Sequence, residues 1–188
     1  MGSSIERTVQ TVRGAVATAG WPPHMAFTML QLRDLHLALW LHSEQDPSDA
    51  EWTAACQAFR QLRKQCGENT ASLRALIISD GGAPNTRQRA QFFQPNVGGR
   101  HRASAISIAL SNPVKRGIAT AITWVNPRFR AFEPLYWCEA FAHVGLSRHI
   151  DTVWNEFAKL QRSLPENRTL RAIAAAARPP SVNVAATG

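Results

Sequence analysis

The amino-acid sequence predicts an α/β fold, with a single mixed sheet of about five strands that begins with a hairpin and is covered by helices. Residues 35–42 place leucine at every second position, a period that belongs to a strand. Residues 46–67 space their apolar side chains by three and four, which is typical of an amphipathic helix. Residues 73–78 form a short apolar run that ends in Ser-Asp-Gly-Gly, as expected of a buried strand before a tight turn.

The rest of the chain continues this alternation of strands and helices. Residues 25–30 pair with 35–42 as the initial hairpin, and Asp46 or Ser48 can cap the helix that ends near Gly67. After residue 78 we expect a helix, a strand, a helix, a strand and two closing helices. These elements are predicted over residues 84–93, 103–110, 112–125, 129–132, 134–144 and 150–160.

Length and composition indicate one folded domain. The chain has 188 residues, of which 45% are hydrophobic and 18% charged, and disordered chains contain fewer apolar residues. Residues 1–20 are polar and weakly patterned, and we expect a mobile arm there. The domain is predicted over residues 21–164, and the Ala-, Arg- and Pro-rich residues 165–188 are expected to form a helical stub followed by a disordered tail.

The order of elements resembles the STAS domain family, the fold of sporulation anti-sigma-factor antagonists and of SEC14-like lipid-transfer cousins. Three segments carry the resemblance, which covers residues 24–162: the strand 35–42, the turn Ser79-Asp80-Gly81-Gly82, and residues 112–127. The resemblance implies a bacterial, non-enzymatic regulatory module. In the family, a similar turn presents a phosphorylatable Ser or Thr, where this chain has Gly81 and Gly82, so the phosphorylation switch is not carried over.

The turn at Asp80 is the predicted partner- or anion-binding surface. A strand end that faces a helix N-terminus exposes backbone N–H groups, and ligands of open α/β sheets bind there. Thr86 is the nearest candidate phosphoacceptor. The alternative interpretation is that two glycines simply make a tight turn and that the cations after residue 113 belong to a solvated helix start. The candidate residues are Ser79, Asp80, Gly81, Gly82, Asn85, Thr86, Arg87, Lys115 and Arg116.

Asp80, Pro84 and Lys115 are also reminiscent of the phosphoacceptor site of a response-regulator receiver domain. A receiver carries its acceptor after the third parallel strand, whereas Asp80 ends the first strand that follows a helix. The order of the strands therefore argues against this alternative.

Aromatic residues gather between 124 and 141. Most of them are expected in the core, but exposed members would be anchors for a protein partner, and Trp124 and Trp137 are the candidates. The net charge of +8 attracts acidic partners and nucleic acid, yet no aromatic residues interleave with the arginines as a base-stacking surface requires. Nucleic-acid binding is therefore the least favoured function.

No known catalytic motif is present in the sequence. The six histidines follow no metal-binding spacing, and the hydrolase, nucleotide-binding and dinucleotide-binding motifs are missing, so we predict no metal, no cofactor and no enzyme. Three cysteines without CxxC spacing fit a reducing compartment. With no secretion signal and no membrane-spanning run, we expect a cytoplasmic protein.

Three functions remain open from the sequence. The first is docking of a protein partner, of unknown identity, at the Asp80 turn. The second is a carrier for a small anionic or lipid ligand, held between the sheet and the helices that begin near Pro113 and Pro134. The third is nucleic-acid binding. The oligomeric state is left open as well.

Overall fold

The computed structural model describes residues 11–14, 22–33, 35–67, 70–92, 94, 105–117, 119 and 128–177. They form one six-stranded mixed sheet, in which the strands lie in the order of the sequence. The pairs β1–β2 and β2–β3 are antiparallel, and the remaining pairs are parallel. The strands are β1 (Thr11–Gly14), β2 (Met25–Gln31), β3 (His36–His42), β4 (Leu73–Ser79), β5 (Ala105–Leu110) and β6 (Phe129–Phe132). The predicted α/β class, mixed sheet and initial hairpin are confirmed, with six strands where about five were expected.

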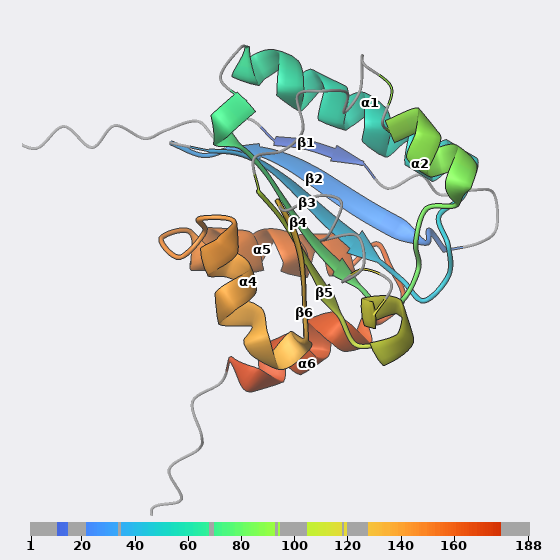
Figure 1. Cartoon of the computed structure of the whole chain (residues 1–188), viewed down its shortest axis with the longest axis vertical. Helices are drawn as coiled ribbons and strands as arrows, with labels where there is room; N and C mark the ends of the chain where they lie inside the picture. The colour runs from blue at the N-terminus through green and yellow to red at the C-terminus, as the bar shows by residue number, and fades with distance from the viewer. Residues whose placement is uncertain are drawn as a thin grey trace, which may run out of the picture.

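Helices cover both faces of the sheet (Figure 1). Each parallel connection leads from one strand to its neighbour on the same side. Because such connections are right-handed, their helices lie on one face of the sheet. This face carries α1 and α2, and α4, α5 and α6 lie on the other. The bounds are α1 (Asp49–Cys66), α2 (Thr86–Phe92), α4 (Trp137–His143), α5 (Ile150–Gln161) and α6 (Arg168–Ala176), with 3₁₀ turns η1 (Thr70–Ser72) and η2 (Pro134–Tyr136). Residues 113–117 are helical as well.

The alternating strand β3 explains why the sheet is buried on both sides. Leu37, Leu39 and Leu41 point to one face and join the core beneath α5 and α6. Ala38 and Trp40 point to the other face and join the core beneath α1. The strand therefore carries apolar residues at nearly every position, as strands between two helical layers do.

Helix α1 begins and ends where the sequence predicts. Ser48 is its N-cap and forms a reciprocal capping box with Glu51, which satisfies backbone N–H groups of the first turn. Gly67 follows the last turn with φ of 58°, a conformation that favours glycine.

The first residues of the chain depart from the predicted mobile arm. Thr11–Gly14 forms β1, paired with β2 over Thr11–Leu30 to Gly14–Phe27. This pairing is decided by the free edge of β2, the next strand of the chain, and no periodicity within residues 11–14 indicates a strand. The arm prediction was therefore wrong for these residues, and residues 1–10 and 15–21 lie outside the described residues.

The helical stub expected after residue 165 is helix α6, and it packs against the core, where a position outside the domain was expected. Asn167 caps α6, whose Leu170 and Ile173 are 8% and 1% exposed and belong to the core. The composition suggested a helix outside the domain, but two apolar residues three positions apart suffice to dock one helical face. The domain thus extends to Ala176, while residues 178–188, the helix prediction beyond 119 and Trp124 lie outside the described residues.

Candidate functional site

The carboxyl ends of the parallel strands meet at one edge of the sheet. His42 at the end of β3 accepts a hydrogen bond from Asp80 N, at 3.1 Å, and Ser43 accepts one from Gly82 N, at 2.8 Å. The loop after β3 and the loop after β4 are therefore joined through their backbones. This is the edge at which open α/β sheets bind their ligands.

The two glycines of the Asp80 turn are required by its geometry. Gly81 has φ of 137°, which a side chain rarely tolerates. A Cβ at position 82 would lie 2.1 Å from the carbonyl oxygen of Gln45 and 2.7 Å from that of Ser43. The Ser79 hydroxyl closes the turn, because it donates to the carbonyl of Gly82 at 2.9 Å and accepts from Gly81 N at 3.0 Å. The glycines are thus explained without a ligand.

The Asp80 carboxylate binds the N-terminus of α6. Its Oδ2 accepts a hydrogen bond from Arg168 N and its Oδ1 accepts one from Thr169 N, both at 2.7 Å. These N–H groups have no partner within the helix, and a carboxylate there is also favoured by the helix dipole. Asp80 therefore holds the C-terminal helix on the sheet edge.

The ends of β3 and β5 contribute to the same junction, and the end of β4 contributes a second time. Asn167 Nδ2 donates to the carbonyl of His42 at 2.7 Å, and the Thr169 hydroxyl donates to the carbonyl of Ser79 at 2.9 Å. The Ser111 and Thr169 hydroxyls lie 2.7 Å apart. The start of α6 thus contacts the ends of β3, β4 and β5, and the ligand-binding edge is occupied by the chain's own residues.

The predicted site residues divide into two groups. Ser79, Asp80, Gly81 and Gly82 lie together with Lys115, whose Nζ donates to the carbonyl of Gly81. Arg116 does not join this group: its guanidinium lies 3.0 Å from the carboxylate of Glu133.

The other predicted residues lie at the start of α2. Asn85 Oδ1 accepts from Gln88 N at 3.0 Å, Thr86 Oγ1 accepts from Arg89 at 3.1 Å, and Arg87 lies 3.7 Å from Asp49. Their contacts are local to α2 and to the start of α1. Thr86 is exposed, and its role as a phosphoacceptor stays a prediction.

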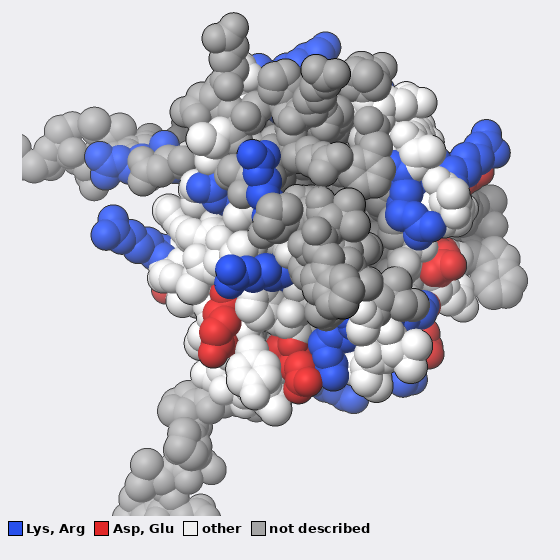
Figure 2. Space-filling view, in the orientation of Figure 1, with Lys and Arg blue, Asp and Glu red and all other residues white. Residues whose placement is uncertain are grey.

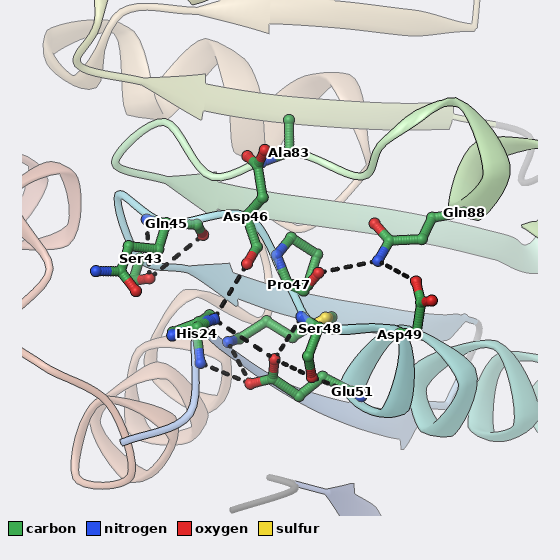
Figure 3. A network of polar contacts seen from close by, with 11 residues as sticks. His24, Ser43, Gln45, Asp46, Pro47, Ser48, Asp49, Glu51, Ala83 and Gln88 are labelled. Carbon is green, nitrogen blue, oxygen red and sulfur yellow. Dashed lines mark hydrogen bonds and ion pairs between the residues drawn. The ribbon is translucent and has the colours of Figure 1, made fainter. Parts of the chain in front are cut away.

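A buried carboxylate that the sequence prediction missed organises the neighbouring loop (Figure 3). Glu51 is 2% exposed and accepts from His24 N, Met25 N and Ser48 N, at 2.6, 3.2 and 2.7 Å, and from the Ser48 hydroxyl at 2.7 Å. Burial acts to raise the pKa of Glu51, but these hydrogen bonds outweigh burial and leave the pKa lowered. The Ser-x-x-Glu spacing of residues 48–51 was the signal that could have found it.

The same loop is fastened to the loop after β4. Asp46 Oδ1 accepts from Ala83 N at 2.9 Å, and Gln88 Nε2 donates to the carbonyl of Pro47 at 2.9 Å (Figure 3). Gln88 is 2% exposed, so this contact belongs to the interior. The loops at this edge therefore form a fixed frame beneath the start of α6.

His42 is a buried neutral residue in that frame. It is 2% exposed, and burial lowers its pKa to about 4, against the opposing charges of Glu51 and Asp46. Since the folded chain binds its proton only near pH 4 and the unfolded chain already does so near pH 6.5, acidification between these values favours unfolding.

We expect the free energy of unfolding to fall by about 2 kcal/mol between pH 7 and pH 5, where most carboxylates still remain charged. Denaturant titrations at the two pH values measure it. In a His42→Gln variant the decrease should largely vanish, and an undiminished decrease would show that another group causes it.

The three exposed large hydrophobic side chains of the described residues lie close to this junction. Val114, Leu135 and Tyr136 are 72%, 70% and 54% exposed. The Arg116–Glu133 ion pair joins the helical residues 113–117 to η2, and η2 contacts α6. We call Val114, Leu135 and Tyr136, with this ion pair between their two elements, the apolar corner.

Trp137, the predicted interface aromatic that the structure describes, packs mainly inward. Its ring makes edge contacts with Phe141 and Trp154, with ring centroids 5.5 and 5.7 Å apart. It lies at the margin of the core beside the exposed Tyr136. The aromatic ring that faces solvent here is that of its neighbour in the sequence, Tyr136.

The described residues contain no cluster of three or more His, Cys, Asp or Glu that could hold a metal ion. None of the helices within the described ranges is long and apolar enough to cross a membrane. The cysteines are unpaired, and burial raises the pKa of Cys56 to about 11 and also raises that of Cys66, so both remain protonated thiols.

Comparison with known proteins gives a similarity to solved structures. No protein-family model matches the sequence, and no curated protein matches it. Among solved structures, the chain is similar to an uncharacterized DUF3478-family protein from Shewanella loihica with a SpoIIAA-like fold. The two share 13% identity over 62% of this chain and 91% of the other, with a TM-score of 0.42. That description belongs to the other protein and says nothing of this chain's function.

Proposed function

We propose that the chain is a non-enzymatic regulatory module of the cytoplasm that docks a protein partner at the apolar corner. The observation that carries the proposal is the exposure of Val114, Leu135 and Tyr136 on elements that meet beside the Asp80 turn. Exposed apolar groups with a polar border favour protein contacts, because covering them removes apolar surface from water. Tyr136 adds a rigid aromatic anchor, a residue type common in interface hot spots.

The Asp80 turn holds the elements next to this surface in place. Because the Asp80 carboxylate binds the start of α6, a partner does not need to enter the sheet edge and contacts the outer surface of the junction instead. Lys115 ties the helical residues 113–117 to the turn through the carbonyl of Gly81. The residues predicted from the sequence thus position the docking surface, and the contacts are made by their neighbours.

The other functions left open by the sequence gain no specific support. The described polar side chains at the sheet edge, such as Asp80, Asn167 and Thr169, are engaged in hydrogen bonds within the chain. Binding of single-stranded nucleic acid would require basic side chains beside a row of exposed aromatic rings. The part of the chain that the structure describes shows no such arrangement. Docking of a protein therefore remains the function that the geometry supports best.

Capture from native lysate with immobilised protein tests the proposal. The variant Leu135→Ser/Tyr136→Ser should lose the captured partner, with a decrease of at least about tenfold, because it removes two anchors from the contact. The matched control is Gln57→Ser/Gln61→Ser on the exposed side of α1, across the sheet, which should retain the partner. Equal recovery by both variants, or no partner for the intact chain, would refute the proposal.

A further inference from the structure

We infer that the carboxyl edge of the sheet is a receptor for the first turn of a helix, and that α6 occupies it in place of a helix from a partner protein. This contact is separate from the apolar corner and does not depend on it. Helix α6 is then a built-in competitor, because it must leave the edge before the partner's helix can enter.

The edge offers hydrogen-bond acceptors in fixed positions. They are the Asp80 carboxylate and the backbone carbonyls of Ser79 and His42. A carboxylate beside carbonyl oxygens repels the phosphates and other anions that open α/β sheets often bind at this edge. The first turn of a helix has the opposite chemistry, since its free N–H groups donate and its end of the dipole is positive. The edge is therefore matched to the start of a helix.

An apolar surface lies next to these acceptors. Leu170 and Ile173 of α6 belong to the same core cluster as Leu76 and Ile78 of β4, the strand that α6 contacts. Helices that bind in grooves present apolar residues three or four positions apart, and Leu170 and Ile173 are three apart. A partner's helix fits this surface if it begins with Asn-x-Thr, as α6 does, and continues with apolar residues at the two corresponding positions.

Helix α6 has the features of a segment that can leave the edge. It is the last helix that the structure describes, and Figure 1 shows it at the outer margin of the layer that also contains α4 and α5. Of its nine residues only Thr169, Leu170 and Ile173 are buried. Segments with few buried apolar residues open at a lower free energy than the core does. We therefore expect α6 to open while the sheet stays folded.

The charged groups on the outer side of α6 add little to its attachment. Figure 2 shows acidic and basic groups at the surface over the lower part of the view, where Figure 1 places α6. Arg171 and Glu166 lie 2.9 Å apart and Arg168 and Glu44 3.9 Å, with side chains that are 65% to 74% exposed. Exposed ion pairs contribute little to stability, because water and salt screen them. The polar first turn and two apolar side chains therefore hold the helix.

A helix of a different protein gains more at this edge than α6 of a second copy does. A second copy offers only the contacts that each chain's own α6 already makes. The residues after Ile173 are alanines with exposed side chains, over residues 174–177. A partner's helix with larger apolar residues at these positions can cover more of the surface and displace α6.

A labelled synthetic peptide of residues 165–177 is the probe, and fluorescence anisotropy measures its binding to the full chain. In the intact chain α6 competes at a high effective concentration, so the peptide should bind weakly. Leu170→Ser/Ile173→Ser loosens the chain's own α6 and should tighten peptide binding at least about tenfold. Asn167→Ala/Thr169→Ala in the chain should act in the same direction, which protects the test against misfolding of one variant.

The controls address the acceptors of the edge. Adding Asp80→Ala to Leu170→Ser/Ile173→Ser should abolish peptide binding, whereas adding Asp151→Ala, at an exposed position of α5, should leave it unchanged. In the intact chain, hydrogen exchange of the α6 amides should be at least about tenfold faster than that of the β3 amides.

Three results would overturn the inference: no peptide binding to either loosened chain while the β3 amides stay protected, binding that ignores Asp80→Ala, or equal protection of α6 and β3. A dimer of the intact chain in sedimentation equilibrium at about 200 μM, lost in Leu170→Ser/Ile173→Ser, would assign the edge to α6 of a second copy and overturn it as well. None of these measurements changes Leu135 or Tyr136, so they test the inference separately from the proposed function.

Discussion

Replacing Glu51 with alanine is expected to lower the free energy of unfolding by about 3 to 4 kcal/mol. The carboxylate is 2% exposed and accepts four hydrogen bonds, from the backbone of His24, Met25 and Ser48 and from the Ser48 hydroxyl. Alanine would leave these donors without their acceptor in the interior, and hydrogen bonds to a charged group are among the strongest in proteins. It would also remove the capping box of α1.

Denaturant unfolding of the Glu51→Ala variant measures this effect. Glu44→Ala is the matched control, because the Glu44 side chain is 74% exposed and changes at such positions usually stay within about 0.5 kcal/mol. A loss below about 1 kcal/mol for Glu51→Ala would mean that the loop before α1 holds its shape without the carboxylate. Because the pKa of Glu51 is lowered in the folded chain, its contribution is present at neutral pH and is lost as the pH falls through that pKa.

Replacing Asp80 with alanine is expected to loosen α6 selectively and to cost about 2 to 3 kcal/mol. Both carboxylate oxygens accept hydrogen bonds from the start of α6, and they are the acceptors of Arg168 N and Thr169 N. Asp80→Asn keeps one carbonyl oxygen and should lose about half as much. The remaining contacts of Asn167 and Thr169 should keep the rest of the sheet folded.

Hydrogen exchange resolved along the chain distinguishes this local effect from global unfolding. In Asp80→Ala the amides of α6 should exchange much faster while those of β3 and β4 stay protected. The control is Asp151→Ala, which removes an exposed aspartate from the first turn of α5. Unchanged protection of α6 in Asp80→Ala would show that its apolar face alone holds the helix.

Much of the fold could be predicted from local patterns in the sequence. The period of two in β3 and the spacing of apolar residues in α1 each persist over several turns or pleats, so they indicated the element, its buried faces and its caps. The short strand β1 was missed because its partner strand, and not its own sequence, determines it. A short helix was expected after residue 165, but its packing in the core was missed, because only Leu170 and Ile173 of an alanine-rich stretch provide that packing.

The sequence predicted where the candidate site lies in the fold, but it did not predict which residues the site contacts. The turn Ser79 to Gly82 does lie at the strand ends beside Lys115. The partner of Asp80, however, lies 88 residues further along the chain, and no spacing rule links the two. The exposure of Leu135 and Tyr136 could not be predicted either, because the apolar sequence around them is typical of a core. Both lie in the 3₁₀ turn that precedes α4, and their side chains are exposed there.

The central claim is that the apolar corner is the surface by which this chain docks a protein. Placing a photo-crosslinking amino acid at Tyr136, with the same group at Gln57 on α1 as the comparison, tests it most directly in native lysate. We predict a discrete covalent adduct from position 136 and none from position 57. Equal adducts from both positions, or none from position 136, would contradict it.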